Sequence, residues 1–331
     1  MGALSIHRHL FGLATVGALL AALPTTPAHA ACTKASNIEA IIDDSGSMDA
    51  TDPDLLRVRG MKLLIGSLSS STTLGAVEFG GNFFDGDPTP PADTLFPPEA
   101  IGPNAAAMGT AMDNLIHADN GGTDYNAAFA QSDNDNPNAD ARIFLTDGGH
   151  DIGTYNNGHL AHKVPTYVIG FSAGIQDEDK ARLNQIATDT GGKYFPETDS
   201  SLLQSVMNEI AADLTCQAAP TSFTDQIAAG KSVGHSIPIS GKVKSAKIVL
   251  TWSSPLDAFT ISSFKIVRHG KTVAKAAKVR KLKIKRTTTD TYVVVQLSRL
   301  VKGTLRFKVK AAKVGSGAPK ATLTTQVSRQ K

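Results

Sequence analysis

Residues 37–214 alternate between short apolar runs and segments with helical spacing, and this alternation restricts the possible folds more than any other feature of the chain. The apolar runs, which are typical of buried strands, lie at residues 37–42, 73–79, 142–145 and 166–171. The helical patterns cover residues 52–68, 105–117, 177–190 and 200–214. Strands that alternate with helices predict an α/β fold with a doubly wound, mainly parallel sheet covered on both faces.

The charge distribution divides the chain into two parts. Residues 31–220 carry 9 basic and 27 acidic side chains, whereas residues 221–331 carry 23 basic and only 3 acidic ones. The second part has no long helical pattern, and its strand candidates are residues 247–252, 264–268, 282–286, 292–297 and 305–310. Several short strands separated by turns predict a β-sandwich. We therefore expect an α/β domain at residues 31–219 and a smaller, basic all-β sandwich at residues 220–331.

The N-terminal residues are typical of an export signal. Arg8 precedes an apolar run over residues 10–23, and a small-x-small pattern follows at residues 28–30. This run is shorter than the roughly 20 residues that a membrane-spanning helix needs. We expect residues 1–30 to be removed as a signal peptide, which leaves a secreted or envelope-associated protein without a transmembrane segment.

Two cysteines, Cys32 and Cys216, stand at the two ends of the acidic part. Disulfides persist in proteins that leave the cytoplasm, and an even number of cysteines favours pairing. The sequence therefore predicts a Cys32–Cys216 disulfide, with two free thiols as the alternative.

Three polar loops fall at the ends of the expected strands and helices. The first contains Asp43, Ser45 and Ser47, the second contains Thr123, and the third contains Asp147. Folds of this kind bind ligands at the carboxyl ends of their strands. Hydroxyls and carboxylates gathered there form an oxygen site that suits Mg²⁺, Mn²⁺ or Ca²⁺ and lacks the Cys or His ligands that zinc prefers.

The three loops, "IIDDSGSM", "GGTDYNAA" and "IFLTDGGHD", resemble those of the von Willebrand factor A-type domain. The metal-ion-dependent adhesion site of that family is written Asp-x-Ser-x-Ser, then Thr, then Asp, and the resemblance covers about residues 36–215. It implies that Ser45, Ser47 and Thr123 bind a divalent cation directly or nearly so, and that Asp43 and Asp147 hold it directly or through water. It also implies a non-catalytic adhesion protein, with Mg²⁺ as the expected cation.

The number of ligands suggests how such a site binds a partner. Mg²⁺ takes about six oxygens, whereas the loops supply only part of that shell and three of their groups are neutral. The cation would keep an open position, which an acidic side chain of a protein partner fills.

Two alternatives to an adhesion protein remain open. Residues 170–174 match the G-x-S-x-G motif of hydrolases, which would make Ser172 a nucleophile, with Asp213 and His235 as candidate partners. Alternatively, the metal would only stiffen a structural envelope protein. Zinc binding by His150, His159 and His162 is disfavoured, because no further ligand stands at a fixed spacing, and we expect these histidines to face solvent.

Two further features bear on what the chain binds. Residues 81–102 hold five prolines and are expected to form a loop that borders the site or serves as a spacer. The basic part is loosely similar to the pre-peptidase C-terminal sandwich, and its charge predicts binding to a polyanion such as a cell-envelope polymer, an acidic lipid surface or the acidic part of this chain. Nucleic acid is the least favoured of these polyanions, because aromatic residues that could stack on bases are scarce.

Overall fold

The computed structural model describes residues 33–81, 90–115, 121–170, 174–196, 202–275, 280–315 and 317–330. The predicted signal peptide lies outside these residues and stays a prediction. None of the helices within the described ranges is long and apolar enough to cross a membrane.

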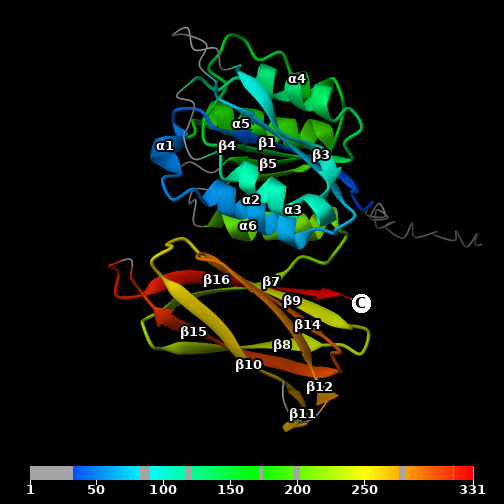
Figure 1. Cartoon of the computed structure of the whole chain (residues 1–331), viewed down its shortest axis with the longest axis vertical. Helices are drawn as coiled ribbons and strands as arrows, with labels where there is room; N and C mark the ends of the chain where they lie inside the picture. The colour runs from blue at the N-terminus through cyan, green and yellow to red at the C-terminus, as the bar shows by residue number, and fades with distance from the viewer. Residues whose placement is uncertain are drawn as a thin grey trace, which may run out of the picture. The chain divides into compact units, whose positions relative to one another are not determined.

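A six-stranded sheet lies at the centre of the first part of the chain (Figure 1). Its strands are β1 (Asn37–Asp43), β2 (Thr73–Phe79), β3 (Ala92–Ala100), β4 (Ala141–Thr146), β5 (Thr166–Gly170) and β6 (Lys193–Pro196), arranged in the order β3-β2-β1-β4-β5-β6. All neighbours are parallel except β3, which pairs antiparallel with β2. The predicted α/β fold with a mainly parallel sheet is thus confirmed.

Helices cover both faces of this sheet (Figure 1). They are α1 (Met48–Thr51), α2 (Leu56–Ser67), α3 (Ile101–Met112), α4 (Tyr125–Asp135), α5 (Asp177–Thr190) and α6 (Leu203–Leu214), with a short 3₁₀ turn at Gly158–Leu160. Alternate residues of β1 face opposite cores: Ile38, Ala40 and Ile42 pack with α2, α3 and α6, whereas Ile41 packs with α4 and α5. A strand buried on both faces explains why neighbouring residues such as Ala40, Ile41 and Ile42 are all apolar.

The expectation of a loop over residues 81–102 is wrong, because β3 occupies Ala92–Ala100. This strand contains Pro97 and Pro98, which cannot donate hydrogen bonds to a neighbouring strand. β3 is the edge strand of the sheet, and its register with β2 shifts at these two residues, so neither proline is part of the regular pairing.

The first predicted helix begins later than expected. Residues 48–51 form α1, and α2 starts at Leu56, four residues into the helical pattern predicted over residues 52–68. Asp52 still serves the start of the helix, because its carboxylate accepts hydrogen bonds from the backbone N–H groups of Leu56 (2.7 Å) and Arg57 (3.0 Å).

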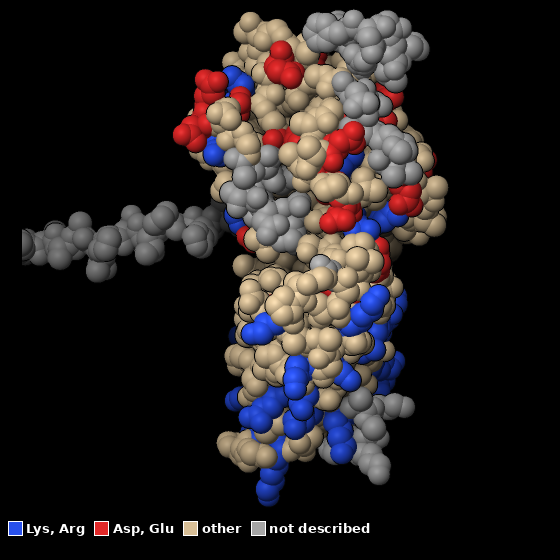
Figure 2. All heavy atoms as spheres, turned by 90° about the vertical axis from the view of Figure 1, so that its left-hand side faces the viewer, with Lys and Arg blue, Asp and Glu red and all other residues tan. Residues whose placement is uncertain are grey.

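The second part of the chain is a β-sandwich, as predicted. Its strands are β7 (Thr221–Ile227), β8 (Ser232–Ile239), β9 (Ser245–Trp252), β10 (Ala258–Arg268), β11 (Lys271–Lys275), β12 (Arg280–Lys281), β13 (Lys283–Thr288), β14 (Tyr292–Ser298), β15 (Gly303–Lys313) and β16 (Ala321–Gln330). They form two five-stranded sheets, β12-β11-β10-β15-β8 and β13-β14-β9-β16-β7, which enclose one apolar core. Lys and Arg gather on the surface of the sandwich, whereas Asp and Glu gather on the α/β part (Figure 2).

Hydrogen bonds between buried side chains join helix α6 to the sandwich. The Nδ2 of Asn208 donates to the Oε1 of Gln326 (3.0 Å), and the Nε2 of Gln326 donates to the backbone oxygen of Ser205 (3.0 Å). Gln204 donates to the hydroxyl of Thr291 (3.0 Å). Residues Thr33–Lys331 accordingly form one compact unit.

Candidate metal centre

Three loops meet at the carboxyl ends of β1 and β4. Asp43 ends β1, Asp147 directly follows β4, and Thr123 lies just before α4. Backbone hydrogen bonds fix the second loop to the first, since the N–H of Gly46 donates to the oxygen of Gly121 (3.1 Å). A Cβ atom on Gly121 would lie 2.2 Å from the oxygen of Gly81, so only glycine permits this approach.

The five predicted site residues form one connected cluster. The hydroxyls of Ser45 and Ser47 are 3.2 Å apart, and Ser47 donates a hydrogen bond to the Oδ1 of Asp147 (2.8 Å). The hydroxyl of Thr123 donates to the Oγ of Ser45 (3.3 Å). The Oδ1 of Asp43 accepts the backbone N–H of Ser45 (2.9 Å). Residues up to 104 positions apart in the sequence thus bring two carboxylates and three hydroxyls together.

The electrostatics of this cluster favour a cation. Asp43 is completely buried, and this burial, followed by the charge of Asp147, raises the pKa of its carboxyl group to about 6. A divalent cation would offset both effects, and every donor in the cluster is an oxygen of the kind that Mg²⁺ and Ca²⁺ bind. Within the described residues, no group of three or more His, Cys, Asp or Glu is placed to hold a metal. A site here therefore depends on hydroxyls for its remaining protein ligands.

Sequence reasoning missed a buried ion-pair network behind the first loop. The Nη2 of Arg57 lies 2.5 Å from the Oδ1 of Asp44, and its Nη1 lies 3.1 Å from the Oδ2 of Asp52. All three side chains are almost fully buried. The network ties the residue after Asp43 to helix α2, and no local pattern in the sequence distinguishes Arg57 from an ordinary surface arginine of a helix.

Further missed residues hold the site carboxylates and the second loop. The hydroxyl of Thr146 donates to the Oδ2 of Asp43 (2.5 Å), and Thr51 donates to the Oδ2 of Asp147. Asp151 accepts the backbone N–H of Thr123 (2.7 Å). These contacts fix the orientation of the carboxylates before any ligand binds.

With this geometry established, the family follows from the sequence. The profile of the von Willebrand factor type A (VWA) domain matches residues 37–209. The chain belongs to this family. No curated protein sequence matches the chain.

Solved structures match the chain at low sequence identity. A von Willebrand factor type A protein from Catenulispora acidiphila is 17% identical, with a TM-score of 0.46; the match covers 89% of this chain and 64% of that one. The pilus adhesin SpaC from Lactobacillus rhamnosus GG is 13% identical, with a TM-score of 0.45, over 89% of this chain and 44% of that one. Proximal thread matrix protein 1 from the mussel byssus, with zinc in its MIDAS (metal-ion-dependent adhesion site) motif, is 20% identical, with a TM-score of 0.44. The match covers 60% of this chain and 51% of that one. This chain spans less than two thirds of the length of each.

The hydrolase alternative gains no support from the described part of the VWA domain and sandwich. Ser172 lies outside the described residues. Asp213 forms an ion pair with Lys193 (3.9 Å), whereas the Nε2 of His235 lies 2.9 Å from the Oδ2 of Asp225 in the sandwich. The two candidate partners are thus each engaged elsewhere.

The expectation that three VWA histidines face solvent is correct only for His162, which is half exposed. The side chain of His150 is buried, and its Nδ1 accepts the backbone N–H of Tyr125 (3.1 Å). His159 is buried too, and its Nδ1 lies 2.6 Å from the hydroxyl of Tyr155. Aromatic neighbours shelter both rings, which explains why a polar loop can bury them.

The predicted Cys32–Cys216 disulfide stays a prediction, because Cys32 lies outside the described residues. The backbone nearby is favourable, since the N–H of Ala35 donates to the oxygen of Leu214 (3.0 Å). This bond holds the first described residues of the VWA domain beside the end of helix α6.

Proposed function

We propose that the chain is an exported, non-catalytic adhesion protein whose VWA domain binds acidic groups of a protein partner through a divalent cation. The observation that carries this proposal is the cluster of five oxygen-bearing side chains, which joins three separate loops through hydrogen bonds of 2.8–3.3 Å. We place this domain at residues 31–219, after a signal peptide at residues 1–30, and the mature protein outside the cytoplasm.

The residues of the cluster would divide the task of holding the cation. Ser45, Ser47 and Thr123 would contribute hydroxyl oxygens, and Asp43 and Asp147 would hold the cation directly or through water. When bound, the cation supplies the positive charge that attracts a carboxylate of the partner. Because three of the five groups are neutral, they leave much of this charge uncompensated for the partner to meet.

Calorimetric titration with Mg²⁺, Mn²⁺ and Ca²⁺ tests the cation site and its metal preference, for which we propose Mg²⁺. Asp43→Ala and Thr123→Ala should each abolish binding. Thr110→Ala is the matched control, because the exposed Thr110 hydroxyl bonds only to the backbone oxygen of Ala106 in its own helix. The Thr110→Ala variant should bind the cation with the affinity of the unchanged protein. Unchanged affinity in both site variants would overturn the site.

Peptide binding tests the adhesion step separately. Aspartate-containing peptides should bind in Mg²⁺ and dissociate in chelator, whereas the same peptides with asparagine should not bind. If the metal binds and raises the melting temperature but no acidic peptide binds, the structural alternative is favoured. Covalent labelling of Ser172 by a serine-hydrolase reagent would instead favour an enzyme.

A further inference from the structure

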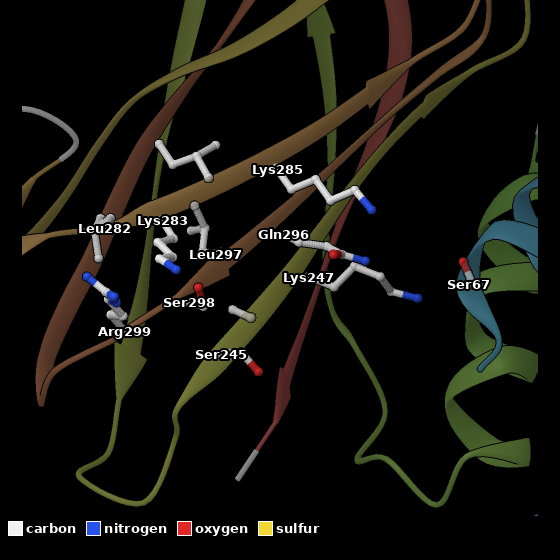
Figure 3. A pocket seen from close by; sticks show the side chains of 12 residues that line it. Ser67, Ser245, Lys247, Leu282, Lys283, Lys285, Gln296, Leu297, Ser298 and Arg299 are labelled. Atoms are coloured by element: carbon white, nitrogen blue, oxygen red, sulfur yellow. The ribbon is translucent and has the colours of Figure 1, made fainter. Parts of the chain in front are cut away.

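The sandwich has a pocket whose walls are cationic (Figure 3). It has a volume of about 910 Å³ and opens against the sheet β13-β14-β9-β16-β7. Four of its residues carry positive charge, namely Lys247 of β9, Lys283 and Lys285 of β13, and Arg299 just after β14. None of the described residues that line it is acidic.

Lys247 is the residue that distinguishes this pocket from a merely basic surface. It is only 7% exposed, yet no ion pair or hydrogen bond with a described residue acts on its ammonium group. Burial lowers its pKa to about 8, so most molecules still carry the charge at pH 7. A charge on a largely buried side chain is costly unless an opposite charge or a hydrogen bond compensates it. An anion bound in the pocket would pair it.

A second polar group at the pocket also lacks a partner. The hydroxyl of Ser67, at the end of helix α2, is buried and makes no hydrogen bond to any described residue. Lys247, Lys285 and Gln296 extend toward Ser67 (Figure 3). Two unpaired polar groups, one charged and one neutral, thus lie at the same end of the pocket.

The lining indicates the chemistry of the ligand. Lys283 and Lys285 are two residues apart on one strand, which places them on the same face about 7 Å apart and suits a chain with repeated charges. Gln296, Ser245 and Ser298 add neutral hydrogen-bonding groups, as hydroxyl-rich ligands require. No aromatic residue is among the described lining residues, so bases would find no surface for stacking.

We propose that this pocket binds a segment of an anionic carbohydrate or polyol chain, whose carboxylate or phosphate groups pair with Lys247, Lys283 and Lys285 and whose hydroxyls bond to the neutral side chains. Its volume lies within the range of about 300–1,000 Å³ that is usual for ligand pockets, enough for a few sugar or polyol units. This site is separate from the cation site of the VWA domain and needs no metal.

Fluorescence anisotropy of the full chain with labelled oligogalacturonate and labelled poly(glycerol phosphate) tests the proposal. These two probes separate a carboxylate source from a phosphate source, and binding of either supports the pocket. Lys247→Met and the double variant Lys283→Gln, Lys285→Gln should each weaken binding tenfold or more. The matched control is Lys310→Gln, Lys313→Gln, which removes two exposed charges from β15, outside the pocket, and should change the affinity less than threefold.

Three outcomes would overturn the proposal. The first is an equal loss of binding in the control variant, because net charge alone would then explain the affinity. The second is equally tight binding of polyglutamate or single-stranded DNA, and the third is an unchanged affinity in Lys247→Met. Melting curves show whether that variant folds, and it should be at least as stable as the unchanged protein because it loses a buried charge. Chelator should not affect the binding, which separates this test from that of the adhesion site.

Discussion

Glu39 illustrates how a single ionisable residue makes the stability of the VWA domain depend on pH. It lies in the middle of β1 and is completely buried, and its Oε2 accepts a hydrogen bond from the Nδ2 of Asn136 (3.0 Å). Its other oxygen has no partner among the described residues. Burial raises the pKa of this carboxyl group to about 8, so the folded protein holds it mostly protonated at neutral pH.

Glu39→Gln should therefore remove a pH dependence of stability. The folded pKa of Glu39 lies above its unfolded value, so its contribution to stability is complete below about pH 4.5 and is lost as the pH rises toward 8. In urea unfolding of the unchanged protein, Glu39 should lower the unfolding free energy by on the order of 3 kcal/mol between pH 4.5 and pH 7. The glutamine variant stays neutral and should lack that loss.

The exposed Glu99→Gln is the control, because it makes the same substitution at a carboxyl group that is not buried, on the edge strand β3. It should keep the pH dependence of the unchanged protein. Parallel pH profiles for all three proteins would contradict the assignment to Glu39.

Elements with a strong and regular pattern are the ones that the sequence predicts well. The observed bounds of β2 and α5 coincide with the predicted ones, because apolar periodicity and the glycines after Thr190 mark where these elements stop. Strand β3 was missed because its prolines are typical of loops, and only its place at the sheet edge makes them acceptable. Helix α4 was missed because its polar sequence resembles a turn.

The sequence likewise predicts only part of the candidate site. Its five predicted residues lie in short local motifs, so the sequence alone identifies them as a group. The contacts that hold them in place, such as Arg57 with Asp44 or Asp151 with Thr123, join residues 13 and 28 positions apart. No periodicity records such contacts, because they depend on how the loops meet in three dimensions.

Arg57→Met tests the network that links helix α2 to the first site loop. Removing the guanidinium leaves Asp44 and Asp52 buried without their cation, which should cost about 3–5 kcal/mol in unfolding free energy. The control is Arg59→Met, whose partner Asp290 is half exposed at 3.1 Å and whose loss should cost less than about 1 kcal/mol. The unfolding free energies are measured by urea unfolding. Similar decreases in the two variants would show that the buried network stabilises the protein no more than an exposed ion pair.

At the scale of the whole molecule, the predicted Cys32–Cys216 disulfide would close a loop around almost the entire VWA domain. In the entropic description such a loop restricts the unfolded chain and stabilises the fold by roughly 3–5 kcal/mol. Intact-mass measurement before and after alkylation decides whether the bond exists in the exported protein. If it does, the double variant Cys32→Ser, Cys216→Ser should melt at a lower temperature; two alkylated thiols without reduction would refute the bond.

The buried hydrogen bonds between helix α6 and the sandwich make a prediction about cooperativity. Because Asn208 and Gln326 bond to each other and are both almost fully buried, separating the two parts would break these hydrogen bonds and expose both side chains to water. We therefore expect residues 33–331 to unfold in one calorimetric transition. Asn208→Ala and Gln326→Ala should each cost about 1–3 kcal/mol, and a double-mutant cycle should give a coupling energy above about 0.5 kcal/mol.

Asn184→Ala on the exposed face of α5 is the matched control for this cycle, and it should change stability by less than about 0.5 kcal/mol. Additive effects of Asn208→Ala and Gln326→Ala, or two separate transitions in the unchanged protein, would mean that the parts fold independently. A single transition that splits in two only in the double variant would instead show that this small set of amide contacts makes the acidic VWA domain and the basic sandwich one cooperative unit.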